Sequence, residues 1–318
     1  MVLAVEAVDL KIGYLDEDGE VRWAVRGVSF QVKEGEIYCF VGESGCGKTT
    51  TGNAIAGILP PHAVTRGKLY VYGVKVIDEE ETYYQGVRGR VVSYIPQNPG
   101  TSLNPYETVG DQFHYVLNSI YGYNRARTLK EAREHLLLVG LNPDLVLDKY
   151  PHELSGGMQQ RVAIGIALAT GARILVADEP TSSLDAHLRL QLVKLLRDLA
   201  AVRRLTTILI THDIVMAGRI CDRIAVMYAG KIVEEGEGRL LFTEPLHPYT
   251  QMLVDAVPLL GVVKPLKSIP GEPPKSGGEI EWCVFRDRCP FFFEKCSKHP
   301  PFFNVVGRKV SCWRYHER

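Results

Sequence analysis

The run Gly42-Glu43-Ser44-Gly45-Cys46-Gly47-Lys48-Thr49 has the pattern G-x-x-x-x-G-K-[ST], which is typical of a phosphate-binding loop. The mostly apolar residues 36–41 predict a buried strand that enters this loop. A helix from about 48 to 59 should follow and end before Pro60-Pro61. The alternative is a glycine-rich turn before a surface helix, which the strand in front of the loop makes improbable. The pattern therefore predicts a nucleotide site in an α/β domain.

The chemistry of such a loop lies mainly in its backbone. Glycines allow a tight turn whose N–H groups surround the phosphates, and the following helix adds the positive end of its dipole. Lys48 can neutralise the β- and γ-phosphates, and the hydroxyl of Thr49 can bind Mg²⁺. The loop residues that we expect at the nucleotide are Gly42, Gly45, Gly47, Lys48, Thr49 and Thr50.

Residues 174–180, Ile-Leu-Val-Ala-Asp-Glu-Pro, predict a second strand of the site. Its apolar residues should be buried and place two carboxylates at its C-terminal end, where ligands bind in open α/β sheets. Asp178 would hold Mg²⁺ through water. Glu179 would act as general base toward the attacking water, a role worth about 10²–10⁴ in rate. In isolation the same pair could be an ordinary turn after a core strand.

Composition narrows the class of protein. Lys+Arg and Asp+Glu are both 37 among 318 residues, so no basic surplus indicates a nucleic-acid surface. No run of about 18 predominantly apolar residues predicts a membrane span. The first residues lack the pattern of a secretory signal. We therefore expect the protein to lie in a reducing cytosol. There its seven cysteines should be thiols or metal ligands rather than members of disulfides.

Strands and helices should alternate along the chain, which favours a mostly parallel sheet. The capping-box pattern Thr128-Leu129-Lys130-Glu131 predicts a helix start inside a mainly helical region of about 100–165. An amphipathic helix is expected at about 186–201. The remaining predicted strands are 4–14, 22–32, 91–95, 174–177 and 207–210.

The stretch Leu154-Ser155-Gly156-Gly157-Met158-Gln159-Gln160-Arg161 resembles the signature sequence of ATP-binding-cassette (ABC) ATPases. Ser155 can cap a helix that begins there, and the glycines let a phosphate approach its N–H groups. A plain helix cap would explain the serine alone. The resemblance implies more: two nucleotide-binding domains face each other, and Ser155 and Gly157 contact the γ-phosphate held by the partner.

Further motifs fit the same family in its order along the chain. Gln97 resembles the Q-loop glutamine that senses Mg²⁺ and the transporter partner, and Ser182-Ser183-Leu184-Asp185 resembles the D-loop. His212, in Thr211-His212-Asp213, resembles the switch histidine that contacts the γ-phosphate, although alone it could belong to a helix cap. Tyr14 matches the aromatic residue that stacks on adenine. The alternative is that Tyr14 belongs to the core, as aromatic residues of strands more often do, and Trp23 lies nearby in the sequence.

The implied fold is an α/β, ABC-type nucleotide-binding domain with a RecA-like core, an antiparallel β subdomain and a helical subdomain at about 100–165. We expect this domain at 1–235 and a small cysteine-containing extension at 236–318. The extension resembles the ATP-binding subunits of oligopeptide/dipeptide transporters. The matching stretches of the extension are Pro245–Thr250 and Ile269–Pro274. In the nucleotide-binding domain, Gln97-Asn98-Pro99 and Thr101–Pro105 also look like that subfamily.

The extension also concentrates cysteines. The spacings lack the C-x₂₋₄-C pairs of most structural zinc sites, and unligated thiols in a small core remain an alternative. The related subunits carry a [4Fe–4S] cluster, which takes four thiolates. The implied ligands are Cys283, Cys289, Cys296 and Cys312. We expect Cys39, Cys46 and Cys221 to be structural residues of the core.

Together these features predict the ATP-hydrolysing subunit of an ABC importer for peptides or similar solutes. The resemblance implies a second ATPase subunit (identical or paralogous), two transmembrane permease subunits, an external solute-binding protein, and a peripheral location at the cytoplasmic face of the membrane. A soluble ABC ATPase of translation or DNA repair is the competing class, but those proteins commonly carry paired cassettes or long inserts. A module that binds ATP without hydrolysis conflicts with Lys48, Glu179 and His212. The transported solute cannot be read from the sequence.

Overall fold

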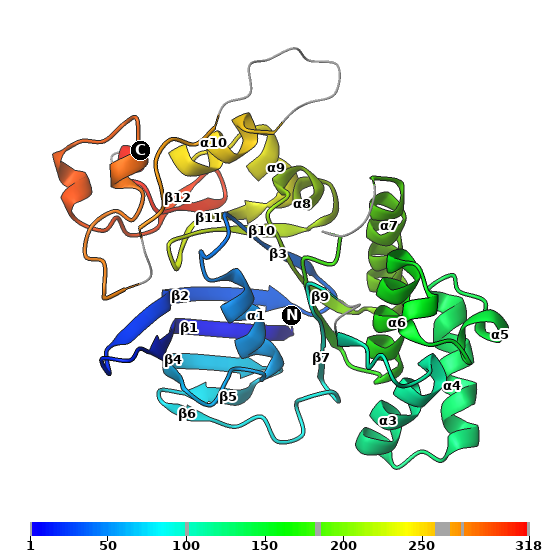
Figure 1. Cartoon of the computed structure of the whole chain (residues 1–318). Helices are drawn as coiled ribbons and strands as arrows, with labels where there is room; N and C mark the ends of the chain where they lie inside the picture. Colours follow the sequence, from blue (N-terminus) through cyan, green and yellow to red (C-terminus); the bar gives the residue numbers. More distant parts are fainter. Residues whose placement is uncertain (1, 99–101, 182–185, 258–267, 275–276, 317–318) are drawn as a thin grey trace. The chain divides into compact units, whose positions relative to one another are not determined.

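The computed structural model describes residues 2–98, 102–181, 186–257, 268–274 and 277–316 (Figure 1). The chain forms two compact units, one comprising Met1–Tyr83 with Ile210–Arg318 and the other Tyr84–Leu209. None of the described helices is long and apolar enough to cross a bilayer.

The first unit contains a five-stranded antiparallel sheet in the order β2-β1-β4-β5-β6. The two predicted early strands are present, but each is longer than predicted. Three strands that the sequence analysis did not predict complete the antiparallel β subdomain. The bounds are β1 (Leu3–Leu15), β2 (Val21–Lys33), β4 (Ala63–Val71), β5 (Val74–Asp78) and β6 (Glu81–Thr82).

The same unit contains β3 (Ile37–Val41), all of whose residues are buried, and α1 (Lys48–Ala56), which follows the glycine loop. The strands lie in the order β12-β13-β11-β10-β3, with β10 parallel to β3 and the other pairs antiparallel. The C-terminal extension therefore adds two strands to the sheet that carries the loop. The other elements are α8 (Ile214–Ile220), β10 (Arg223–Tyr228), β11 (Lys231–Glu237), α9 (Gly238–Thr243), α10 (Pro248–Asp255), η2 (Arg286–Arg288), η3 (Glu294–Ser297), β12 (Phe303–Val305), β13 (Arg308–Val310) and η4 (Trp313–Tyr315).

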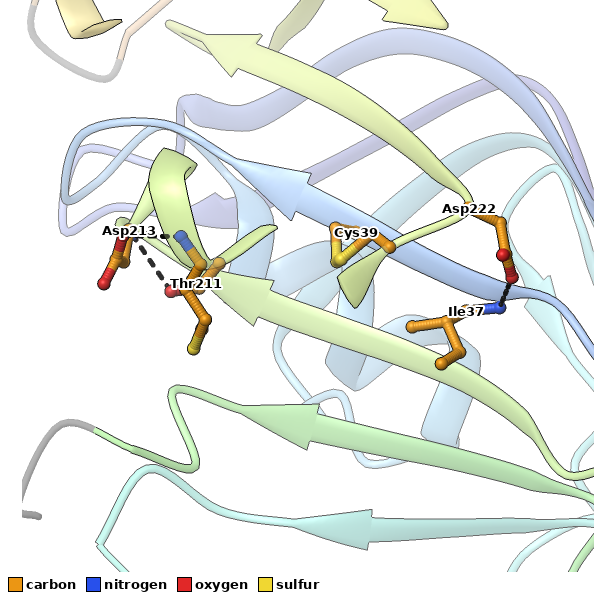
Figure 2. The surroundings of a disulfide bond; sticks show 7 residues. Ile37, Cys39, Thr211, Asp213 and Asp222 are labelled. Atoms are coloured by element: carbon orange, nitrogen blue, oxygen red, sulfur yellow. Dashed lines mark hydrogen bonds between the residues drawn. A yellow bond between two sulfur atoms is a disulfide. The ribbon is translucent and has the colours of Figure 1, made fainter. Parts of the chain in front are cut away.

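A disulfide joins Cys39 of β3 to Cys221 at the end of α8, with the two Cα atoms 6.0 Å apart (Figure 2). The expectation that these two cysteines are thiols is therefore wrong. It rested on the redox state of a compartment, whereas the fold brings the two residues within the Cα separation of a disulfide.

The second unit carries β7 (Val92–Ile95) parallel to β8 (Ile174–Asp178), with β9 (Thr206–Thr211) beside β8; β9 continues across the unit boundary. Helices fill the region between β7 and β8, as predicted. They are α3 (Val109–Tyr121), α4 (Arg125–Leu138), α5 (Pro143–Val146), η1 (Pro151–Glu153) and α6 (Gly156–Ala169), and α7 (Ala186–Arg203) follows β8.

The predicted helix start at Thr128 is wrong. Helix α4 begins at Arg125, and the side chain of Asn124 caps it by accepting a hydrogen bond from the N–H of Arg127. Thr128 is buried inside the helix. A capping box does occur at the start of α3, between Thr108 and Asp111. A Thr-x-x-Glu pattern also occurs inside helices, so it does not by itself mark a helix start. The capping box of α3 has aspartate in place of glutamate or glutamine, and the searched pattern therefore did not find it.

Candidate functional site

The phosphate loop follows β3 directly, and its glycines are required by close backbone packing. Gly47 has φ 101°, and a Cβ atom there would lie 2.5 Å from the carbonyl oxygen of Ala24. A Cβ on Gly42 would lie 2.2 Å from the carbonyl oxygen of Met227. The loop is thus fitted tightly between β2 and β10, and side chains at these positions would displace it.

Lys48 begins α1 and is 5% exposed. Its Nζ donates hydrogen bonds to the carbonyl oxygens of Gly42 at 2.7 Å and Glu43 at 2.8 Å, so the cation bridges the start of its own loop. Thr49 is exposed, and Thr50 is half-buried beside it. The structure therefore places the predicted cation and hydroxyls together on the first turn of α1.

Tyr14 and Trp23 differ in their surroundings. Trp23 is 5% exposed and lies under the guanidinium of Arg66, 5.4 Å from its ring centroid, so it belongs to the core. Tyr14 is half-buried, and its hydroxyl donates to the Oγ1 of Thr50 at 3.4 Å. Of the two, Tyr14 is the aromatic ring that a ligand at the first turn of α1 could reach.

His212 lies between β9 and α8 and is exposed. Its neighbour Asp213 caps α8 by accepting a hydrogen bond from the N–H of Met216 at 2.9 Å. The N–H of Asp213 in turn donates to the Oγ1 of Thr211 at 3.0 Å (Figure 2). The residue that caps α8 is therefore Asp213 and not His212, so the alternative role of His212 in a helix cap is not needed.

In the second unit, the predicted carboxylates stand at the end of β8. Asp178 is 2% exposed and accepts a hydrogen bond from the hydroxyl of Tyr94 at 3.1 Å. Burial of Tyr94, and then the charge of Asp178, raise the pKa of that hydroxyl, so it stays protonated and remains a donor. The sequence analysis missed Tyr94, although its place in the strand paired with β8 could have marked it.

Glu179 is brought together with another predicted residue. The Nε2 of Gln97 donates to its Oε2 at 2.9 Å. Glu179 has φ 43°, in the left-handed region that residues other than glycine seldom adopt. Such strained backbone concentrates at functional sites, which supports a functional role for this carboxylate.

The signature residues form an open helix N-terminus, as predicted. Ser155 is the N-cap of α6, and its side chain accepts a hydrogen bond from the N–H of Met158 at 3.4 Å. Gly156 is exposed, and a Cβ atom there would meet no atom within 4 Å. Gly157 follows it in the same turn. The predicted D-loop, including Asp185, lies outside the described residues.

The cysteines of the extension carry free thiols. The N–H of Cys283 donates to the carbonyl oxygen of Cys296 at 3.1 Å. Burial, with smaller contributions from the neighbouring cysteines, raises the pKa of Cys283 to about 12. Among the residues that the structure describes, no group of three or more His, Cys, Asp or Glu could hold a metal ion. The side-chain arrangement therefore does not support the expected [4Fe–4S] cluster.

Two family models match the sequence. Residues 25–182 match "ABC transporter", and residues 233–296 match "Oligopeptide/dipeptide transporter, C-terminal region". A probable peptide ABC transporter ATP-binding protein of Sinorhizobium fredii is 38% identical, over 99% of this chain and 96% of the relative. The dipeptide transport ATP-binding protein DppD of Bacillus subtilis is also 38% identical, over 100% of this chain and 96% of the relative.

Solved structures match the cassette as well. A dimeric post-hydrolysis state of the ATP-binding cassette MJ0796, bound to ADP and Pi, has a TM-score of 0.66 and 30% identity. The match covers 74% of this chain and 99% of that cassette. The structure of cbiO1 from Clostridium perfringens, part of the transporter complex cbiONQ, has a TM-score of 0.64 and 26% identity, over 77% of this chain and 92% of that one.

Proposed function

The chain belongs to the ABC transporter family, and we propose that it is the ATP-hydrolysing subunit that powers an importer of peptides or similar solutes. One observation carries this proposal: relatives named as peptide and dipeptide transport ATP-binding proteins match essentially the whole chain, extension included, at 38% identity. The local geometry fits ATP hydrolysis, since a phosphate loop, a Gln97–Glu179 hydrogen bond and an open α6 N-terminus occur in one chain.

In the proposed ATP site, the ammonium of Lys48 exchanges its contacts with the loop carbonyls for the β- and γ-phosphates. Glu179 accepts a proton from the attacking water, and Gln97 holds its carboxylate in place. His212 contacts the γ-phosphate, and Tyr14 stacks on adenine. Mg²⁺, when bound, neutralises charge on the phosphates. Its ligands in this proposal are Thr49, Gln97 and Asp178, all with oxygen atoms that the ion prefers.

The proposed working unit is a pair of cassettes. Ser155 and Gly157 of one chain contact the γ-phosphate held by the phosphate loop of the other, and Asp185 belongs to the same interface. The exposed N-terminus of α6 supports this, because the N–H groups of a first helical turn and the helix dipole attract an anion. The second cassette is identical or a paralogue. Two transmembrane permease subunits and an external solute-binding protein complete the importer, with this chain on the cytoplasmic face of the membrane.

We also propose a boundary near residue 235 between the cassette and its extension, supported by the family model that begins at residue 233. A [4Fe–4S] cluster on the four cysteines of the extension remains a proposal by resemblance. It requires these thiols to lose their protons and to adopt side-chain positions that differ from those described here.

Copurification with permease subunits tests the transport function. A tagged chain, isolated from its native membrane in mild detergent, should retain two integral membrane proteins, and ATPase activity in the reconstituted assembly should rise with peptide and binding protein. Isolation with ribosomes or a repair complex instead would favour the soluble class of ABC ATPase.

A further inference from the structure

A buried arginine of the C-terminal extension contacts the phosphate loop. Arg288 is 8% exposed and lies in η2. Its Nη1 donates to Oε2 of Glu43 at 2.7 Å, and its Nη2 donates to Oε1 of the same carboxylate at 3.1 Å. Glu43 is the second residue of the loop. The pair is therefore a two-point ion pair between segments 245 residues apart.

The position of the guanidinium is fixed by further acceptors. Its Nε donates to the carbonyl oxygen of Pro270 at 2.8 Å, and its Nη2 also donates to that of Ile269 at 3.2 Å. Its Nη1 donates to the hydroxyl of Tyr228 at 3.3 Å. With so many fixed partners, the planar fork holds one orientation, and it determines the position of the carboxylate that it binds.

Glu43 is held through its backbone as well. Its N–H donates to the hydroxyl of Tyr249 at 2.9 Å, and its carbonyl oxygen accepts from Lys48. Tail residues Glu272–Pro274 also line a hollow of about 290 Å³ together with residues 43–46 of the loop. The extension thus borders the loop over several residues.

The charge of Glu43 matters for nucleotide binding. A carboxylate in a phosphate loop repels a polyanion, and this repulsion is strongest where little water lies between the charges. An ion pair that only anchored the tail would add little stability, because desolvation offsets most of its attraction. Pairing the carboxylate of Glu43 with the guanidinium of Arg288 reduces that repulsion.

We propose that Arg288 is a positioning residue for ATP, which neutralises Glu43 and holds its carboxylate away from the phosphates. The inference rests on the proposed ATP site. It makes the extension a part of nucleotide binding, although none of its residues belongs to a nucleotide motif.

A double-mutant cycle on the full chain tests the proposal, with the affinity for ATP measured by titration calorimetry. R288M should weaken binding about tenfold in the wild-type background, where a bare carboxylate remains in the loop. In the E43Q background the same change should weaken binding less than about twofold, because no charge is left to neutralise. R288K, which keeps the cation without the fork, should lie between.

The matched control is R286M. Arg286 lies in the same short helix, stacks on Trp282 and pairs with its neighbour Asp287 rather than with a residue of the phosphate loop. This variant should bind ATP like the wild type. The loss in R288M should also shrink at high salt, which an unfolded tail would not produce.

Equal weakening by R288M in both backgrounds would overturn the proposal and leave Arg288 as an anchor of the tail. Thermal unfolding tests the anchoring role independently. R288M and E43Q/R288M both lack the Arg288–Glu43 ion pair, so their melting temperatures should be similar while their affinities for ATP differ. A chain that shows the expected coupling but does not drive peptide uptake would contradict the proposed transport function alone. Absence of ATP binding in the wild type would overturn both.

Discussion

Removing the Cys39–Cys221 disulfide should lower the free energy of unfolding markedly. The bond closes a loop with a sequence separation of 182 residues. The chain-entropy relation gives about 5 kcal/mol at 25 °C for a loop of that length, and removal of natural disulfides typically costs about 2–5 kcal/mol. We therefore expect a loss of about 2–5 kcal/mol on reduction or in the variant C39A/C221A.

The assay has two parts. Thiol titration of denatured protein counts the bond directly: seven cysteines, of which five carry free thiols, should give five reactive groups without reductant and seven with it. Guanidinium unfolding then measures stability with and without reductant. C39A/C221A serves as the control, because its unfolding midpoint should match that of the reduced wild type and should not respond to reductant.

ATP binding should change little in the same variant. The start of β3 is held next to the disulfide by two hydrogen bonds, from the N–H of Ile37 to Oδ2 of Asp222 at 2.8 Å and from the N–H of Asp222 to the carbonyl oxygen of Ile37 at 2.9 Å (Figure 2). These bonds keep the strand that leads into the phosphate loop in register. Seven reactive thiols in protein that was denatured without reductant would show that the disulfide is absent. Equal unfolding midpoints with and without reductant would show that it does not stabilise the fold, and either result would refute the prediction.

Three further predictions concern the proposed sites. E179Q should retain ATP binding, lose about 10²–10⁴ in turnover and accumulate as a nucleotide-bound dimer, because glutamine cannot accept the proton of water; near-normal hydrolysis would remove Glu179 from the role of base. S155R should abolish hydrolysis while the isolated chain still binds ATP, because the side chain blocks a helix N-terminus that acts on the partner's phosphate; equal loss of ATP binding would contradict a site acting in trans. If a [4Fe–4S] cluster is held by the extension, anaerobic protein should contain about four irons and four sulfides per chain, and serine at any one ligand should weaken the cluster. Zinc without iron, or no metal at all, would rule the cluster out. The cysteines to replace are Cys283, Cys289, Cys296 and Cys312.

Features encoded by neighbouring residues could be predicted from the sequence. The strand–loop–helix at β3 and α1 depends on an apolar run, glycines and a lysine that are adjacent in the chain. The cap of α6 by Ser155 and the carboxylates at the end of β8 follow from equally local patterns. The family resemblance assigned Gln97 and Glu179 separate roles at the nucleotide, but their hydrogen bond was not predicted, because 82 residues separate the pair.

Features that depend on distant partners could not be predicted in this way. A cysteine pattern carries no information on which two residues the fold will bring within bonding distance, so the disulfide was missed. The strands β4 and β5 are a different case: residues 68–78 are rich in aromatic and β-branched residues on both sides of Gly73, a local hairpin signal that the sequence analysis overlooked. Strand β6 has only two residues and is stabilised by pairing with β5. At Thr128 a local pattern gave a wrong prediction. The capping-box sequence is present there, but helix α4 begins three residues earlier, at Arg125.

The C-terminal extension is distinct in sequence, yet it packs against the strands that precede the phosphate loop. Strand β13 pairs with β11, and the N–H of Trp23 in β2 donates to the carbonyl oxygen of Gly277 at 3.1 Å. Lys11 pairs with Glu279 at 2.6 Å, although both are partly exposed and the pair contributes little by itself. Backbone hydrogen bonds and the buried Arg288 thus join the extension to the strands around the phosphate loop, so the boundary proposed near residue 235 separates two parts of the chain that share one network of hydrogen bonds.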